Sequence, residues 1–428
     1  MIFFYWLVAI LPLETHRFWG YQLAGTFTIV KLVGLLCFLL AAIRILTQGS
    51  RPPFFQCSTS WWFAAFFLLQ CSSYLVQEGH LADPMGAYSH IVSIFLLFVA
   101  TLTLVNSRLR LRRSLLVAIG AVGFTSLYAI REWQKYHGLY AGFRPGGMLS
   151  DPNEYALIAG LWMPLAFLWA FGKRPRWEKI LCLGCFACCV LGTTFAASRG
   201  CFLGMMASFL FLIWHSRRRA RNLALAAVLL LPVGLLGSHS AFDRLLHPSH
   251  SDYLAKEARI TAWQAGWKMI TAHPVFGVGL RNFKAVMPDY QAKNIKVDSI
   301  AHNTYVEVAA ELGVPALLIF LGMWVVSFRM LGRVRRRTQT GRLRGLFPIA
   351  LGLQAGMVAY LVNAFFLSTS FYKMVWFLLF LAVCVNHLAE ARRAPQIEED
   401  AVCPDWAMVG PGLAPAEAAP RGGPTFER

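Results

Sequence analysis

The stretch YSHIVSIFLLFVATLTLVN, residues 88–106, contains no Asp, Glu, Lys or Arg. A helix of roughly 17–25 mostly apolar residues is long enough to cross the hydrocarbon core of a bilayer. Backbone groups in lipid must be hydrogen-bonded within their own segment, so such a run favours a helix. The stretch therefore predicts a transmembrane span.

Similar runs recur along the 428 residues, of which 57% are hydrophobic and only 14% charged. A mean hydropathy of +0.52 excludes an ordinary soluble globular protein. The sequence predicts an all-α fold, a polytopic membrane helical bundle with about 12 transmembrane helices. The predicted spans lie near 2–13, 24–46, 60–77, 88–106, 114–132, 153–172, 179–196, 201–215, 222–238, 314–331, 346–367 and 371–390.

The net charge of +19 suggests a nucleic-acid partner, but its placement favours a membrane explanation. If the spans alternate in direction, every basic cluster falls on one side of the membrane, which is the positive-inside pattern. Both termini are then predicted to be cytoplasmic, and no nucleic-acid partner is expected. The basic clusters are 108–113, 173–179, 217–221 and 333–344, followed by Arg392 and Arg393.

The longest outward-facing loop is predicted at 239–313, between the ninth and tenth spans. Loops of this length usually carry function. Its segment 255–270 has a helical pattern, and the glycines of HPVFGVGLRNF (273–283) indicate turns. We therefore expect a transmembrane domain at 1–393 that includes this helical periplasmic loop. The remainder, 394–428, is rich in Pro, Ala and Gly and is predicted to be a disordered cytoplasmic tail.

Four of the ten cysteines cluster in CLGCFACC (182–189). Cysteine clusters can hold metals. These lie within a predicted span and have no histidine or carboxylate neighbours, so we expect them to behave as small apolar residues. No metal and no cofactor are predicted.

Three polar residues on the outer side of the membrane are candidate catalytic or phosphate-binding residues. Arg199, in ASRGCF (197–202), lies between two apolar spans with almost no loop to carry it. A charge at that depth is expensive and often functional, although an arginine can also reach the headgroups. His302 can act as a base near neutral pH, although a histidine at a helix start can be purely structural. Arginines such as Arg199 and Arg259 can bind phosphate oxygens bidentately, so their convergence would suit a diphosphate.

Several motifs, taken together and in this order, resemble the O-antigen ligase and polymerase superfamily. The resemblance covers about 150–390. It comprises DPNEYA (151–156), ASRG (197–200), ARITAWQAGWKMITAHPVFGVGLRNF (258–283) and HNTYVEVAAELGVPALL (302–318).

The resemblance implies a metal-independent, inverting glycosyltransferase in the bacterial inner membrane, with its active site facing the periplasm. The donor would be a glycan on undecaprenyl diphosphate, and the acceptor a sugar hydroxyl of lipid A–core. The family's catalytic residues correspond to His302, Arg259 and Arg199. We further predict substrate binding by a second group of residues near the outer face: Arg281, Arg144, Asn153, Asn303 and Tyr305.

Other functions remain open at the level of sequence. A polymerase, or a ligase that glycosylates proteins, would use the same donor with a different acceptor. A membrane transporter is an alternative of another class, but it would place polar residues on both sides of the membrane midplane. Convergence of Arg199, Arg259 and His302 in one outward cavity would favour the enzyme.

Overall fold

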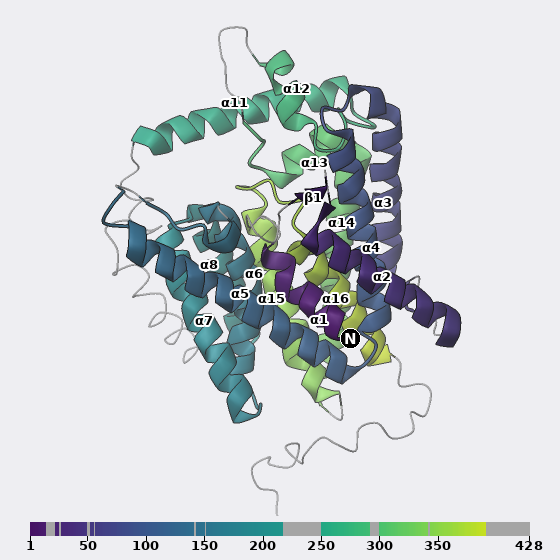
Figure 1. Ribbon diagram of the computed structural model, residues 1–428, viewed down its shortest axis with the longest axis vertical. Helices are drawn as coiled ribbons and strands as arrows, with labels where there is room; N and C mark the ends of the chain where they lie inside the picture. Colours follow the sequence, from purple (N-terminus) through teal and green to yellow (C-terminus); the bar gives the residue numbers. More distant parts are fainter. Residues whose placement is uncertain are drawn as a thin grey trace, which may run out of the picture. The chain divides into compact units, whose positions relative to one another are not determined.

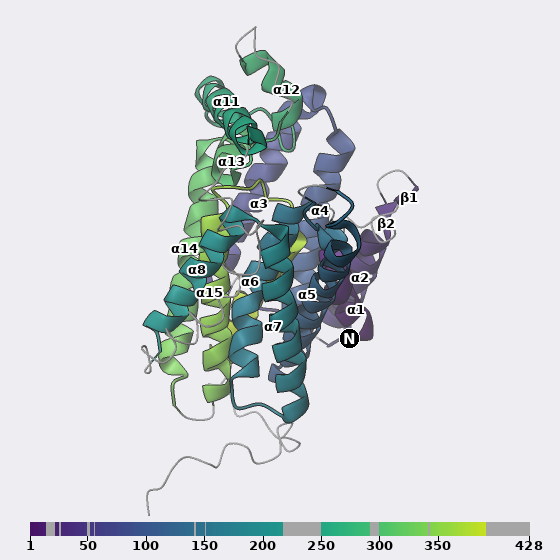
Figure 2. The same cartoon turned by 90° about the vertical axis from the view of Figure 1, so that its left-hand side faces the viewer.

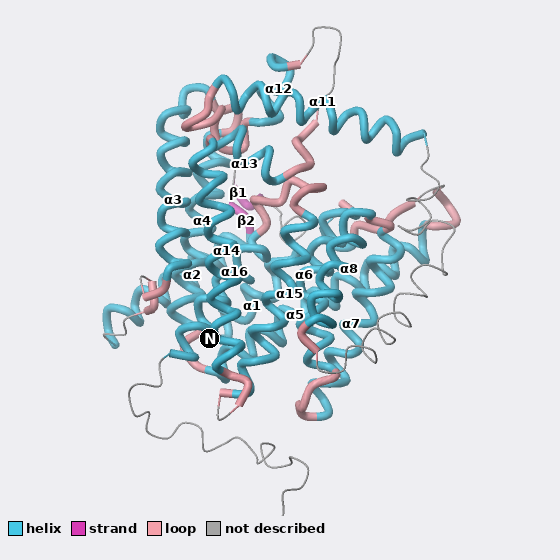
Figure 3. Tube along the Cα trace, turned by 180° about the vertical axis from the view of Figure 1, so that it is seen from behind, coloured by secondary structure: helices cyan, strands magenta, loops and turns pink. Residues whose placement is uncertain are grey.

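The computed structural model describes residues 1–13, 22–24, 27–48, 52–54, 56–140, 143–149, 151–216, 250–291, 299–340 and 343–390. Within these ranges the regular secondary structure is helical, apart from one short antiparallel pair of strands, β1 (Gln22–Ala24) and β2 (Phe27–Thr28), and loops connect the elements (Figure 3). The α-helices are α1 (Ile2–Ile10), α2 (Ile29–Gln48), α3 (Ser58–Gln77), α4 (Pro84–Leu104), α5 (Arg108–Tyr136), α6 (Pro152–Ala170), α7 (Arg176–Ala196), α8 (Arg199–Trp214), α11 (His250–Ala272), α12 (Phe283–Tyr290), α13 (Thr304–Leu312), α14 (Val314–Arg337), α15 (Phe347–Asn363) and α16 (Lys373–Glu390). Short 3₁₀ turns are η1 (Leu11–Leu13), η2 (Glu78–His80), η3 (Gly147–Leu149) and η4 (Arg344–Leu346).

The membrane character predicted from the sequence is confirmed. Seven described helices are long and apolar enough to cross a bilayer, and Ile2–Leu13 and Arg199–Trp214 are shorter apolar helices. The predicted span at 222–238 lies outside the described residues, as do the tail from 391 and the segments 217–249 and 292–298. The total of about twelve spans therefore stays a prediction. The span predicted from residue 24 instead begins at Ile29, because the hairpin precedes it.

Several helices begin directly after a polar residue whose side chain caps the first turn. The Asp83 carboxylate accepts a hydrogen bond from the Gly86 amide at 2.8 Å, and Pro84 follows as the first residue of α4. Ser107 caps α5 in the same way, accepting from the Arg110 amide at 3.3 Å. Such caps satisfy amides that have no partner within the helix. They fix where each helix leaves its loop.

Helix α16 lies at the centre of the bundle (Figure 1). Its side chains are buried from Lys373 to Asn386, and it packs on α4, α14 and α15. Aromatic rings fill the contacts around it. Phe380 lies edge-on to Phe63 of α3 at a centroid distance of 5.0 Å, and Phe377 contacts Phe4 of α1 at 6.3 Å. A helix covered on all sides explains why this span is apolar around its whole circumference.

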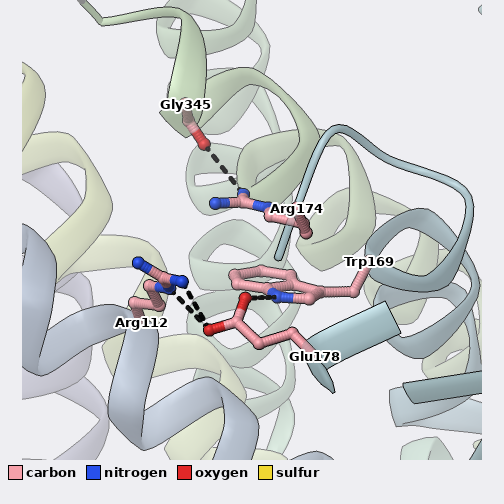
Figure 4. A network of polar contacts seen from close by, with 5 residues as sticks. All are labelled: Arg112, Trp169, Arg174, Glu178 and Gly345. Atoms are coloured by element: carbon pink, nitrogen blue, oxygen red, sulfur yellow. Dashed lines mark hydrogen bonds and ion pairs between the residues drawn. The ribbon is translucent and has the colours of Figure 1, made fainter. Parts of the chain in front are cut away.

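Two of the predicted basic clusters, 108–113 and 173–179, meet in one polar network with Gly345, the residue directly after a third cluster (Figure 4). Glu178 forms an ion pair with Arg112 at 2.6 Å and accepts a hydrogen bond from the Trp169 indole at 3.0 Å. The Arg174 guanidinium stacks over Trp169 and donates to the Gly345 carbonyl. This network joins the start of α5, the α6–α7 turn and the turn before α15. The cluster at 217–221 lies outside the described residues.

Helices α5, α6 and α7 lie side by side in Figures 1 and 2. The contact between α5 and α7 is close because Gly123 has no side chain. A Cβ at that position would collide with the side chain of Cys185 and approach its Cα to 3.1 Å. A Cβ at Gly120, one turn earlier on α5, would meet nothing within 4 Å.

We expect Gly123→Ala to destabilise the bundle, because overpacking a tight contact costs about 1–3 kcal/mol. Gly120→Ala should be neutral or slightly stabilising, since alanine is the better helix former. Thermal unfolding of the two variants in detergent measures the difference. Equal melting temperatures would contradict the close α5–α7 contact.

Candidate functional site

A cavity of about 360 Å³ lies where five separate segments of the chain meet. The segments are the α6 start with its preceding loop, the α7–α8 junction, α11, the residues before α13, and the residues after α15. It is lined by Arg144, Asn153, Ser198, Arg199, Gly200, Ala255, Ala258, Arg259, Ser299, His302, Phe366 and Leu367. We call it the arginine cavity.

Arg199 reaches the cavity from a junction of only two residues. Helix α7 ends at Ala196, and its C-cap residue Ala197 has the left-handed conformation, with φ of 48°. Ser198 is then the N-cap of α8, and Arg199 is its first residue. Gly200 lets α8 approach the α15–α16 segment, because a Cβ there would lie 2.9 Å from the Phe366 side chain. The short junction therefore holds Arg199 at the edge of the bundle.

Arg144 and Asn153 enter the cavity as a linked pair. The Arg144 guanidinium donates to the Ala196 carbonyl at 2.7 Å and to the Asn153 side-chain oxygen at 2.9 Å. Asp151 caps α6 by accepting from the amides of Asn153 and Glu154, at 2.8 and 3.0 Å. The pair therefore positions the α6 start against the end of α7.

Arg259 lies on α11, the helix predicted at 255–270. This helix packs on α12 and α13. The indole of Trp263, one turn after Arg259, donates to the Ala301 carbonyl at 2.8 Å. Trp263 therefore anchors α11 next to His302 and brings Arg259 to the same cavity.

His302 has a strained backbone and a buried ring nitrogen. Its φ of 47° is left-handed, which is rare for a residue with a side chain. Its Nδ1 is buried and has no hydrogen-bond partner among the described residues. Burial and the charge of Arg259 lower the pKa of His302, while the charge of Asp151 opposes that shift. The neutral imidazole is thus favoured at neutral pH, where it can accept a proton.

Asn303 and Thr304 hold His302 in place. The Asn303 side chain caps α13 by accepting from the amides of Tyr305 and Val306, at 3.0 and 3.2 Å. The Thr304 hydroxyl donates to the Leu367 carbonyl at 2.6 Å, and its amide donates to the Ala364 carbonyl at 2.8 Å. Both residues are buried. They fasten the start of α13 to the segment that follows α15.

Two buried carboxylates of α13 serve packing rather than the cavity. Glu311 accepts hydrogen bonds from the amides of Arg281 and Phe283, at 2.9 and 3.1 Å. Glu307 accepts from the Ser370 hydroxyl at 3.3 Å. Burial, and for Glu307 also the charge of Glu311, raises the pKa of both groups. Neither residue lines the arginine cavity.

The structure brings five of the eight predicted site residues to the arginine cavity: Arg144, Asn153, Arg199, Arg259 and His302. The other three do not line it. Arg281 is exposed, with φ of 62°, and faces the Phe371 ring. The Tyr305 hydroxyl donates to the Leu361 carbonyl at 2.6 Å, and Asn303 is the helix cap.

Sequence analysis missed the residues that the α15–α16 connection contributes. Phe366 and Leu367 line the cavity, but their apolar side chains place them in the predicted span 346–367. Helix α15 ends earlier, at Asn363. The seryl and threonyl residues that follow at 368–370 were the available signal that the helix stops near this point.

A comparison with known sequence families bears on this site. A family model described as O-antigen ligase matches residues 184–321. The match confirms the resemblance to the O-antigen ligase superfamily, and it contains Arg199, Arg259 and His302. Arg144 and Asn153 lie before it. No curated protein sequence matches the chain.

The capping role of Asn303 predicts a difference between two substitutions. Asn303→Ala should destabilise the start of α13 by about 0.5–2 kcal/mol, while Asn303→Ser should restore the cap. Thermal unfolding measures stability, and a glycan-transfer assay on the same samples measures activity. Recovery of both with serine is expected. Recovery of stability without activity would instead assign the amide side chain to substrate binding.

Proposed function

We propose that this chain is a member of the O-antigen ligase superfamily and acts as a glycan ligase of the bacterial inner membrane. It would move a glycan from undecaprenyl diphosphate to a sugar hydroxyl of lipid A–core at the periplasmic face. The observation that carries the proposal is the convergence of Arg199, Arg259 and His302 in one cavity, with Arg144 beside them. Three guanidinium groups and one imidazole suit a diphosphate leaving group and a hydroxyl nucleophile.

The proposed reaction is a single displacement. The acceptor oxygen forms a bond to the anomeric carbon of the donor, while the bond from that carbon to the diphosphate oxygen breaks. The electron pair leaves with the diphosphate, so negative charge grows on its oxygens. Arg199 and Arg259 would stabilise that charge electrostatically. One displacement implies inversion at the anomeric carbon, and the leaving group needs no proton.

His302 is proposed as the base. The acceptor hydroxyl loses its proton as the new bond forms, and the neutral imidazole of His302 would receive it. The position of His302 in the lining of the arginine cavity and its lowered pKa support this role. Arg144, held by Ala196 and Asn153, would bind the donor diphosphate from the α6 side. The arginines supply the positive charge that a metal ion provides in other transferases, so the proposed mechanism is metal-independent.

The course of the helices supports a periplasmic site. Helix α7 begins at the basic network of Glu178 and ends at Ala196, beside the cavity. The cavity and the basic clusters thus lie at opposite ends of α7. Under the positive-inside pattern the basic end is cytoplasmic. We therefore propose that the cavity and the loop 239–313 face the periplasm, and that both termini are cytoplasmic.

A polymerase or a protein-glycosylating ligase would use the same donor chemistry, and these are the alternatives that experiment must separate. The transporter alternative is less well supported, because the clustered arginines and His302 gather at one end of the helices. A translocation path would be expected to line both halves of the membrane.

His302→Ala and Arg259→Ala should insert normally and lose transfer, by about a hundredfold or more where a charge-stabilising group is removed. The measurement is a gel of lipopolysaccharide from a strain lacking the gene, complemented with each variant. We expect the inactive variants to give lipopolysaccharide whose core carries no glycan polymer, while the polymer accumulates on the lipid carrier. Exposed Lys135, which lies outside the cavity, gives the matched control Lys135→Gln, with a normal ladder.

Core carrying a single repeat unit would identify a polymerase and contradict the ligase assignment. An unchanged ladder in the strain lacking the gene would point to a protein acceptor or to a transporter. His302→Gln with substantial activity would show that the residue orients the hydroxyl and does not take its proton.

The lowered pKa of His302 predicts a pH dependence. A base must be unprotonated, so transfer should persist as the pH falls and decline only below about 6.5, the ordinary histidine value. Asp151→Asn keeps a residue that caps α6 but removes the charge that raises the pKa of His302. The acidic limb of the pH–rate profile should then move to lower pH. An unmoved limb, or one that moves upward, would exclude His302 as the titrating base.

A further inference from the structure

A second cavity, of about 250 Å³, lies between α1, α2, α4 and the start of α16. Its walls are mainly apolar, and it shares no lining residue with the arginine cavity. We call it the α2–α4 groove. It is lined by Leu7, Leu11, Val30, Lys31, Leu32, Gly34, Leu35, Met85, Tyr88, Ser89, Val92, Ser93, Leu96, Leu97 and Lys373.

Positive charge gathers at one end of this groove. Lys31 and Lys373 both line it, near the starts of α2 and α16. The charges of these lysines, together with that of Arg281, also act on the buried ring of His90 in α4. Helices α2, α4 and α16 all begin at this end, and the positive ends of helix dipoles add to the attraction for an anion. Serine hydroxyls at Ser89 and Ser93 are further polar groups in the wall.

The sides of the groove lead toward hydrocarbon. Helices α2 and α4 are both candidate membrane spans. Leu32 and Leu35 of α2 are about two-fifths exposed, and Met85 of α4 is more than half exposed. Large apolar side chains left exposed on a membrane helix face lipid rather than water. A molecule that occupies the groove can therefore enter from the bilayer.

We propose that the α2–α4 groove binds an anionic phospholipid, with its phosphate at Lys31 and Lys373 and part of one acyl chain along the leucines of α2 and α4. The assignment follows because the α2–α4 groove is apolar, lies between membrane helices and has two lysines at one end. A soluble phosphate would gain nothing from the apolar walls. A zwitterionic lipid has no net charge to complement the lysines. The proposal does not depend on the transfer reaction.

The segment between α15 and α16 separates the groove from the arginine cavity. Phe366 and Leu367 line the cavity, whereas Lys373, at the end of the same segment, lines the groove. Arg281, predicted as a substrate-binding residue, faces Phe371 in this segment. The groove and the arginine cavity therefore lie beside the same connecting segment but share no lining residue.

A substitution at Gly34 can fill the α2–α4 groove without changing a charged residue. It lines the groove, and a Cβ at this position would meet only Leu7, at an ordinary distance of 3.9 Å. A leucine side chain can therefore extend into the groove and occupy the space proposed for the acyl chain. Gly34→Leu and the lysine substitutions test the two halves of the site separately.

The experiment is native mass spectrometry of the full chain in detergent, titrated with dioleoyl phosphatidylglycerol or dioleoyl phosphatidylcholine. Wild type should retain the anionic lipid preferentially. Lys31→Gln and Lys373→Gln should each weaken its binding roughly fivefold, as expected for one cation near a lipid phosphate. Gly34→Leu should abolish retention, and Lys135→Gln, at an exposed position near the end of α5, should leave it unchanged. Melting temperatures of all variants establish that they are folded.

Equal retention of the two lipids, or retention that survives Gly34→Leu, would overturn the proposal. Displacement by soluble glycerol phosphate would show that the ligand is a free anion. Displacement by undecaprenyl phosphate at a lower concentration than phosphatidylglycerol would assign the groove to the polyprenyl carrier instead. Both displacement results reject the phospholipid assignment, and neither bears on the role of the arginine cavity.

Discussion

The hydrogen bonds of Thr304 are the constraint on which the candidate site depends. Its hydroxyl donates to the Leu367 carbonyl and accepts from the Thr369 amide at 3.1 Å, while its own amide donates to Ala364. These bonds bind the first turn of α13 to the connection after α15. Phe366 in that connection packs on Gly200 of α8. One buried threonine therefore holds the segments that carry His302 and Arg199 in register, although it lines no cavity itself.

The strength of this junction explains how strained backbone persists there. Ala197 and His302 both have positive φ and both flank the arginine cavity. Such conformations cost of order 1–3 kcal/mol each and survive only where the surroundings fix them. Ala197 lies between two packed helices, and His302 lies between the Trp263 anchor at Ala301 and the Asn303 cap. Two of the three positive-φ residues other than glycine in the described part of the chain therefore flank the proposed site, while the third, Arg281, lies in the turn before α12.

Hydropathy was sufficient to predict the long apolar helices of the bundle, because an apolar run in lipid has few alternatives to helix. Helical periodicity at 255–270 also predicted α11. Neither hydropathy nor periodicity could show which polar loop residues line the cavity. Arg144 and Arg281 look equivalent in sequence, yet only Arg144 lines the cavity. The difference arises because Glu311 binds the amides of Arg281 and Phe283, a tertiary contact that no local pattern contains.

The two buried glutamates of α13 explain why charged residues occur directly before the apolar helix α14. A buried carboxylate is tolerated only when hydrogen bonds replace water. Glu311 receives them from the glycine turn, whose amides at Val278 and Gly279 also donate to the carbonyls of Ala310 and Glu311. Glu307 receives its bond from Ser370. The two carboxylates, four residues apart on one face of α13, thus fasten it to the turn before α12 and to the segment before α16. The histidine proposed as the base is therefore held by carboxylates that take no part in the chemistry.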